Sequence, residues 1–394
     1  MQRIKTIAWE QRKLGECFTE RKESMPEGEL ISVTIGEGIK KFSELGRHDN
    51  SNDDKSKYKK VCVGDIAYNS MRMWQGASGY SPYEGIVSPA YTVLSPITDV
   101  VDSKCISYLF KRSDMTHVFQ MNSQGITSDN WNLKYPALSE IEIMVSPYLA
   151  EQHKIAAYLS RIDNLITLQQ RKCDKLVNVK KSMLEKMFPR EGAKVPEIRF
   201  EGFTDDWEQR KLGDMVSFSK GSGYSKGDLK EDGTPIILYG RLYTKYETII
   251  SEVDTFVDEK KGSVFSKGGE VIVPASGETA EDISIASVVE KSGVLLGGDL
   301  NIITPTDEMD SAFLAISISN GKPRNDMAKM AQGKSVVHLH NTDLEKIDLP
   351  YPSYDEQRRI SGFFSDLDNL IALQQRKLEK LKNIKKSMLE KMFV

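Results

Sequence analysis

The side chains of this chain that could do chemistry are mostly amides, hydroxyls and cations gathered in loops. Between residues 1 and 147 three such loops stand out: Arg47–Lys60, Asn69–Gln75 and the loop around Gln124-Gly125. Arg and Lys can bind guanine and phosphate groups, and Asn and Gln can bind adenine, so these loops would be the candidate contacts if the chain binds DNA. The candidate DNA contacts here are Arg47, Asn50, Lys57, Lys59, Asn69, Arg72, Gln75, Gln124, Thr127 and Asn130.

A second set of such side chains lies between residues 189 and 352. It includes lysines and tyrosines in the region 220–246, a glycine-containing loop at Ser276–Thr279 and the basic stretch Lys322–Lys334. Each residue taken alone is better explained as a solvated loop side chain, so the prediction rests on the clusters. The candidate DNA contacts here are Lys220, Tyr224, Lys226, Arg241, Tyr243, Lys245, Ser276, Thr279, Lys322, Arg324, Asn325, Gln332 and Lys334.

No catalytic motif accompanies these loops. The sequence has no Walker P-loop, no GxSxG and no pair of adjacent prolines, so the (Asn/Asp/Ser)-Pro-Pro-(Tyr/Phe) motif of amino-methyltransferases is absent. His338 and His340 would share one face of a strand, but a zinc site needs three or four ligands. We therefore predict that the chain is not an enzyme and binds no metal.

The charge of the chain changes from segment to segment. The formal net charge of the whole chain is −3. By segment it is −1 for residues 1–147, +4 for 148–188, −9 for 189–352 and +3 for 353–394. DNA binding would therefore depend on local clusters, or on a partner that supplies positive charge. No apolar run approaches the roughly 20 residues that span a bilayer. With four scattered cysteines and no apolar leader, we expect a cytoplasmic protein without a membrane partner.

Two internal repeats organise the chain. Glu151–Phe188 returns as Glu356–Phe393 with 25 of 38 positions identical at an offset of 205, and Trp9–Gly15 (WEQRKLG) returns as Trp207–Gly213. The segments between these repeats are barely alike. We expect Trp9 and Trp207, which both copies of the short repeat share, to be structural. This predicts target-binding domains at 1–147 and 189–352, a central spacer helix at 148–188 and a C-terminal spacer helix at 353–394.

The longer repeat predicts two amphipathic helices. Apolar residues recur at alternating spacings of four and three over more than four heptads, which is typical of a coiled coil. Neither helix can bury its apolar stripe alone, so we expect an antiparallel pair about 50 Å long. Gln169 and Gln374 either fix the register or lie at the margin of the stripe. The predicted apolar seam consists of Ile155, Leu159, Ile162, Ile166, Leu176, Met183, Ile360, Phe364, Leu367, Ile371, Leu378, Leu381 and Met388.

The two unlike segments share an outline of strands and short helices. Each has a glycine turn before a strand, a second strand, a helical stretch, a Gln-Gly loop and a closing strand that ends at a proline. We predict the α+β class, with two related mixed α/β domains in a pseudo-twofold internal repeat. The predicted helical stretches are 103–121 and 310–319, and the predicted strands include 88–94 and 298–304.

Over almost its whole length the chain resembles the specificity (S) subunits of type I restriction-modification systems. The resemblance rests on VPEIRFEGFTDDWEQRKLG (Val195–Gly213) and on EQ-x-x-I followed by LD-x-L/I before the spacer. Gly64–Gly79 resembles one lineage of target-recognition domain, and Pro274–Ile283 resembles another. The VPEIRFEGFTDD segment has no counterpart before Trp9, which is a departure from the family pattern.

The resemblance implies a DNA sequence-specificity subunit that does no chemistry. Each target-recognition domain would read half of an asymmetric bipartite site on double-stranded DNA, and the helices would set the gap between the halves. Two methyltransferase (M) subunits would dock on the helices and modify adenine N6 with S-adenosylmethionine. Restriction and translocase (R) subunits would use ATP and Mg²⁺, so no cofactor is expected in this chain.

Two other classes of function stay open. The chain could be a protein-interaction scaffold that never meets DNA, or an enzyme with an unrecognised active site. The basic residues of the spacer, such as Lys180 and Lys385, are explained equally by solvent exposure and by a partner that binds twice, because both copies carry them.

Overall fold

The computed structural model describes residues 9–36, 38–49, 51–333 and 336–393. The chain divides into two compact units, the first holding residues up to 170 together with those from 376 onward, and the second holding residues 171–375. Each unit therefore contains one variable segment and a part of each repeated segment. No helix in the described ranges is long and apolar enough to cross a membrane.

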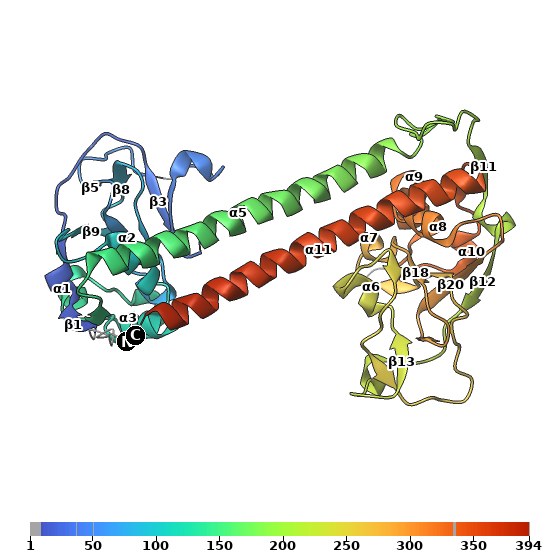
Figure 1. Cartoon of the computed structure of the whole chain (residues 1–394). Coiled ribbons are helices and arrows are strands. Elements are labelled where there is room, and N and C mark those ends of the chain that lie inside the picture. The colour runs from blue at the N-terminus through green and yellow to red at the C-terminus, as the bar shows by residue number, and fades with distance from the viewer. Residues whose placement is uncertain (1–8, 37, 50, 334–335, 394) are drawn as a thin grey trace, which may run out of the picture. The chain divides into compact units, whose positions relative to one another are not determined.

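The repeated segments form the two longest helices of the chain, as their spacing predicts. Helix α5 spans Leu149–Lys186 and helix α11 spans Tyr354–Met392, each uninterrupted (Figure 1). At 1.5 Å per residue each is about 57 Å long. In unit 1 the beginning of α5 packs with the end of α11, and in unit 2 the end of α5 packs with the beginning of α11.

The part of unit 1 before α5, called domain 1 below, is built on a four-stranded antiparallel sheet of order β2-β9-β6-β7. The predicted helical stretch 103–121 is two helices, α2 and α3, separated by a turn at residues 110–112. The strands of domain 1 are β1 Glu10–Lys13, β2 Phe18–Glu20, β3 Ile31–Thr34, β4 Gly38–Lys41, β5 Lys59–Val61, β6 Ile66–Asn69, β7 Ser78–Tyr80, β8 Gly85–Val87, β9 Tyr91–Pro96 and β10 Glu142–Val145. Its helices are α1 Leu14–Cys17, α2 Ser103–Leu109, α3 Ser113–Met121 and α4 Tyr135–Ser139.

The part of unit 2 between α5 and α11, called domain 2 below, contains a five-stranded sheet of order β12-β20-β16-β18-β14 and a smaller sheet β15-β13-β19. Its strands are β11 Glu208–Lys211, β12 Val216–Lys220, β13 Thr234–Ile237, β14 Ile249–Ile250, β15 Phe256–Val257, β16 Glu270–Pro274, β17 Ser276–Gly277, β18 Ser287–Val289, β19 Leu295–Leu296, β20 Leu300–Pro305, β21 Val337–His338 and β22 Asp348–Tyr351. Its helices are α6 Gly240–Thr244, α7 Ala280–Ile283, α8 Ser311–Ile318, α9 Gly321–Met330 and α10 Asn341–Leu344.

The two domains are related mixed α/β domains. The order β2-β9-β6-β7 in domain 1 matches β12-β20-β16-β18 in domain 2. The opener Glu-Gln-Arg-Lys forms β1 in one domain and β11 in the other, and each strand pairs antiparallel with the strand that closes its domain. Behind these strands Leu14 N–H donates to Ile141 O at 2.8 Å, and Leu212 N–H donates to Ile347 O at 2.9 Å.

The tryptophan of the opener has the same structural role in both units. The ring of Trp9 packs edge-on against Phe393 with a centroid distance of 5.9 Å, and Trp207 packs edge-on against Phe188 at the same distance. Phe393 and Phe188 occupy equivalent places in the two copies of the long repeat. Aromatic pairs of this kind stabilise a core beyond the area they bury. The structural role predicted for the two tryptophans is confirmed.

Candidate nucleic-acid interface

Two polar loops that are far apart in the sequence meet in domain 1. Strand β6 ends at Asn69, and the loop that follows it contacts the Gln-Gly loop at residues 124–132. Leu133 N–H donates to Ser70 O at 2.8 Å, and the buried Tyr68 hydroxyl donates to Leu133 O at 3.0 Å. The structure therefore brings two of the three predicted clusters of domain 1 together.

A pair of tryptophans joins these loops. The rings of Trp74 and Trp131 are perpendicular, with centroids 5.2 Å apart, and Trp74 Nε1–H donates to Met71 O at 3.1 Å. Both side chains are half-buried. Their contact fixes the relative position of two surface loops.

The side chains presented by these loops are polar, with an apolar tip. Arg72 is exposed and its Nη1 donates to Oε1 of the half-buried Gln75 at 3.2 Å, while Asn69 Oδ1 accepts from Met71 N–H at 3.0 Å. Ile126, next to Gln124-Gly125, is 99% exposed. The other predicted contacts on this surface are the exposed Gln124, Thr127 and Asn130.

The remaining predicted cluster of domain 1 is divided in the structure. Arg47 and Lys57 are exposed, but Lys59 Nζ donates to Tyr91 O at 2.7 Å and lies 3.9 Å from a carboxylate oxygen of Glu20. Lys59 thus ties β5 to β9. Asn50 lies outside the described residues.

Domain 2 contains an equivalent pair of loops. Strand β17 follows β16 directly and pairs with β21, so that Ser276 faces His338 in the Gln-Gly loop of residues 332–338. Leu339 N–H donates to Ala275 O at 2.9 Å, as Leu133 does to Ser70 O in domain 1. We call each pair of loops, 70–77 with 124–132 and 275–279 with 332–333 and 336–338, a two-loop cluster.

The Gln-Gly loops need their glycines. Gly125 has φ +148° and Gly333 has φ +147°, values that L side chains rarely adopt. A Cβ atom on Gly125 would lie 2.6 Å from Asn130 O, and one on Gly333 would lie 1.9 Å from Val336 O. The same backbone conformation therefore recurs in two loops whose other residues differ.

The side chains of the second cluster include hydroxyls, a carboxylate and an amide. Ser276 is buried, and the hydroxyl of Tyr243 donates to its carbonyl oxygen. Thr279 Oγ1 accepts from Asp282 N–H at 3.1 Å and so begins helix α7. Thr279, Glu278 and Gln332 are exposed, and Lys334 lies outside the described residues.

Several predicted contacts of domain 2 are used inside the domain. Arg241 is 9% exposed and pairs with Asp254 and, at 2.9 Å, with Glu247. Lys245 lies 3.3 Å from Asp254. The hydrogen bond from Arg241, followed by the one from Lys245, lowers the pKa of Asp254.

Tyr224 is likewise buried, whereas the lysines on either side of it are exposed. The Tyr224 ring lies 4.6 Å from Lys260 Nζ, and its hydroxyl hydrogen-bonds Ser263. Lys220 and Lys226 remain exposed at the surface. Of this predicted cluster, the lysines alone are presented to solvent.

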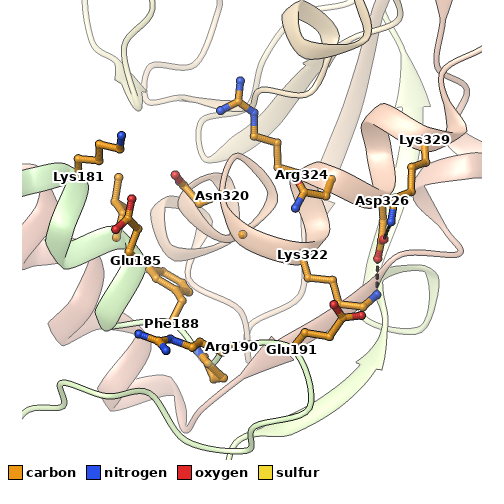
Figure 2. Close-up of a pocket in the computed structure, with 14 residues that line it drawn as sticks. Lys181, Glu185, Phe188, Arg190, Glu191, Asn320, Lys322, Arg324, Asp326 and Lys329 are labelled. Carbon is orange, nitrogen blue, oxygen red and sulfur yellow. Dashed lines mark hydrogen bonds and ion pairs between the residues drawn. The ribbon is translucent and has the colours of Figure 1, made fainter.

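The predicted basic stretch of domain 2 lines a groove of about 780 Å³ beside the end of α5 (Figure 2). Lys322 pairs with Asp326 along α9, and the guanidinium of Arg324 points away from that pair (Figure 2). The groove combines five cationic side chains with three carboxylates. Its charged lining residues are Lys181, Glu185, Arg190, Glu191, Lys322, Arg324, Asp326 and Lys329, and Asn325 lies beside them.

The long helices also present exposed leucines. Leu165 and Leu168 in unit 1 are 51% and 61% exposed, and the equivalent Leu370 and Leu373 in unit 2 are 39% and 47% exposed. The predicted seam lies mostly inside. Ile155, Leu159, Ile162, Ile360, Phe364, Leu367, Ile371 and Leu378 are buried, and Ile166, Leu176, Met183, Leu381 and Met388 are half-buried.

A buried glutamine at the start of each long helix was not predicted. Gln152 Oε1 accepts from the N-cap N–H of α2 at 2.7 Å, and its Nε2 donates to Ser146 O at 2.8 Å. Gln357 makes the same bonds, with the N-cap N–H of α8 at 3.0 Å and with Pro352 O at 3.0 Å. The signal in the sequence was Glu-Gln at the same place in both copies, a polar pair kept without an evident partner.

Within residues 9–36, 38–49, 51–333 and 336–393, no three His, Cys, Asp or Glu side chains are grouped to hold a metal ion. The rings of His338 and His340 stack with centroids 6.4 Å apart.

Comparison with known proteins gives consistent matches. A family model described as "Type I restriction modification DNA specificity domain" matches residues 7–178 and 204–383. The chain is 22% identical over 351 residues to the type I restriction enzyme MjaVIII specificity subunit of Methanocaldococcus jannaschii, covering 85% of this chain and 81% of that relative.

Two solved structures are similar in fold. The S subunit of a type I restriction-modification system from M. genitalium has a TM-score of 0.64 at 18% identity, covering 100% of this chain and 98% of that one. A chain from a structure on the assembly of the type I R-M system has a TM-score of 0.55 at 16% identity, covering 98% and 97%.

Proposed function

Because the chain belongs to the type I restriction-modification DNA specificity family, we propose that it is the subunit that chooses the DNA sequence and that it catalyses no reaction. Domain 1, at 1–147, and domain 2, at 189–352, would each read one half of an asymmetric bipartite site. The spacer helices, at 148–188 and 353–394, would set the gap between the halves.

The observation that carries this proposal is the two-loop cluster, which has one backbone frame and two sets of side chains. The bonds from Leu133 to Ser70 and from Leu339 to Ala275 build the same junction in both domains. A frame that repeats while its side chains change is suited to reading different sequences with one docking geometry.

In domain 1 the cluster has the groups that distinguish bases. Arg72 can bind guanine O6 and N7, and the amides of Gln124 and Asn130 can bind adenine. The exposed side chain of Ile126 suits contact with a thymine methyl group. We therefore assign base reading in domain 1 to loops 70–77 and 124–132.

In domain 2 the cluster would read through Thr279, Gln332 and the carboxylate of Glu278, which can accept a hydrogen bond from cytosine N4. The cations Lys322, Arg324 and Lys329 would serve the phosphate backbone. Since residues 189–352 carry a net charge of −9, most of the positive charge that attracts DNA would come from a partner subunit.

The helices would pair as an antiparallel coiled coil with pseudo-twofold symmetry and would dock the partners on their outer faces. Leu165 and Leu168 share a helix face, and the equivalent Leu370 and Leu373 repeat it. A surface presented twice suits two methyltransferase subunits, which would bring S-adenosylmethionine and flip the adenine that they methylate. Restriction subunits with ATP and Mg²⁺ would join through the methyltransferases.

The test is to co-express the chain with a cognate methyltransferase and to map methylated adenines in the host genome. We expect methylation at a single asymmetric bipartite sequence, and we expect replacement of residues 9–147 by another domain to change one half only. The purified chain alone should methylate and cleave nothing, since activity without partners would identify an enzyme. DNA affinity that stays negligible with methyltransferase present would identify a protein scaffold instead.

A further inference from the structure

A carboxylate on α5 links domain 1 to the other long helix. One oxygen of Asp163, Oδ2, accepts from the Tyr108 hydroxyl of helix α2 at 2.7 Å. The other oxygen, Oδ1, lies 2.6 Å from Lys385 Nζ on α11. The same lysine lies 5.7 Å from the centroid of the Tyr108 ring. Three elements of unit 1 therefore meet at one side chain.

Unit 2 repeats this arrangement with the helices exchanged. Asp368 on α11 accepts from Thr248 Oγ1 at 3.1 Å through Oδ2, and it pairs with Lys180 on α5 through Oδ1. Thr248 lies immediately before β14 of domain 2. Each aspartate thus uses one oxygen for a domain and the other for the opposite helix.

The constant and variable parts of the sequence contribute differently to these links. Asp163 and Asp368 are equivalent in the long repeat, and so are Lys180 and Lys385. The hydroxyl partner comes from a domain and is a tyrosine in one unit and a threonine in the other. Two unlike domains therefore supply the same chemical group to the same position of the spacer.

We propose that Asp163 and Asp368 are positioning residues, which hold each domain at a fixed orientation on the paired helices and so fix the gap that is read. This rests on the proposed function, because it assigns to these aspartates the coupling between spacer and DNA site. Successive base pairs are about 3.4 Å apart. Reading a gap that differs by one base pair therefore requires a domain to move by about this distance along the DNA and to turn by about 35°, because the duplex makes one turn in about 10.5 base pairs.

The ion pairs are suited to choosing a register and not to adding stability. The side chains of Lys180 and Asp368 are 22% and 32% exposed, and half-exposed pairs of this kind stabilise a fold only weakly. A slip of the antiparallel helices by one heptad would place Lys180 opposite Ser361 or Gln375 in place of Asp368. Charged pairs beside a coiled-coil seam select orientation and register in this way.

The first arm of the test needs no DNA. Spin labels on Lys181→Cys of α5 and Glu290→Cys of domain 2, in a chain that also carries Cys62→Ser, report the distance between helix and domain. We expect one narrow distance distribution in the parent and a wider one in Thr248→Val and in Lys180→Met. Thr234→Val is the matched control, because the Thr234 hydroxyl bonds Glu259 inside the domain, and it should leave the width unchanged.

The second arm uses the same variants with methyltransferase and a plasmid library in which the two half-sites are separated by different gaps. Thr248→Val, Tyr108→Phe and Lys180→Met should each reduce the preference for the parental gap roughly two- to fivefold. In an Asp368→Ala background, Thr248→Val and Lys180→Met should have no additional effect, because both act through the removed carboxylate. A merely structural contribution would instead lower methylation equally at every gap.

The outcomes are distinguishable. If the parent methylates one gap and the variants keep both its preference and the narrow distance distribution, the positioning role is overturned while DNA reading stands. If the parent methylates no gap, DNA reading is overturned together with the coupling to the gap. Wider distributions together with a weaker gap preference in both hydroxyl variants support the proposal.

Discussion

The two domains have the same backbone framework, but the side chains on their two-loop clusters differ in charge and polarity. Domain 1 presents Arg72 and the apolar Ile126 from its two-loop cluster, whereas domain 2 presents Glu278 and Thr279 from equivalent loops. Backbone bonds, buried leucines and glycine conformations are kept between them. The difference teaches that the framework is separate from the surface, so the surface can change without a new fold.

The helices show the reverse pattern, since their surfaces are repeated. The exposed Leu165 and Leu370 are identical, and so are Leu168 and Leu373. A surface that must accept the same partner twice has reason to stay constant, whereas a surface that reads two different half-sites has reason to differ. The contrast between the domains and the helices can be tested by measuring folding stability, partner binding and base reading.

The largest effect is expected from the buried glutamines. Gln152→Leu would leave one N–H and two carbonyl groups of its unit without partners, at a cost of about 3 kcal/mol in free energy of unfolding. Gln357→Leu should cost a similar amount, because its bonds are the same. Chemical denaturation of each variant measures this cost. Gln209→Leu, at an exposed position of β11, is the control, and unequal losses in the two units would contradict a shared framework.

Partner docking should be affected next. Leu165→Arg with Leu168→Arg should weaken binding of one methyltransferase about 30-fold, because each buried apolar anchor is worth 1–2 kcal/mol at an interface. Leu370→Arg with Leu373→Arg should weaken the other equally. Light scattering measures the mass of the complex and so distinguishes one bound methyltransferase from two. An exposed leucine that binds nothing would leave two methyltransferases bound in both variants.

Base reading in domain 1 is predicted to depend on a smaller number of contacts. Arg72→Ala should relax selection at one guanine by about 1–3 kcal/mol while leaving the half-site of domain 2 unchanged. Methylome mapping gives the base frequencies of both half-sites in one experiment. Lys22→Ala, at a position 82% exposed and outside the two-loop cluster, should leave the base frequencies as they are. A change in the other half-site would mean that the two domains do not read independently.

The sequence predicted the parts of this protein that repeat and was less successful with the parts that pair through space. Regular 4-3 spacing predicts α5 and α11 because helix periodicity is local. The pairing of Trp74 with Trp131 was not predicted, because the two residues are far apart in the sequence and meet only in the folded chain. Arg241 resembled a DNA contact by type alone, and its carboxylate partners Glu247 and Asp254 lie on either side of β14.

The smallest predicted effect concerns the side chain that hydrogen-bonds the neighbouring loops in each domain. Lys111 follows helix α2 and its Nζ donates to Gly76 O at 2.6 Å and to Ile35 O at 3.2 Å. At the corresponding place after α8, domain 2 uses the uncharged Ser319, whose Oγ accepts from Ala286 N–H at 2.8 Å. Domain 1 therefore relies on a titratable group where domain 2 does not.

Burial, with a smaller contribution from the charge of Lys385, lowers the pKa of Lys111 to about 8. Between pH 8 and the ordinary lysine pKa of 10.5, the unfolded chain binds more protons at this lysine than the folded chain does. The free energy of unfolding therefore rises with pH across this window. From pH 7 to pH 9 we expect the parent to gain about 1 kcal/mol relative to Lys111→Met, measured by denaturation at both pH values. Ser319→Ala should weaken domain 2 equally at both. A pH-independent difference between the parent and Lys111→Met would show that Lys111 stays charged, and the contrast between the two fastenings would then be one of geometry alone.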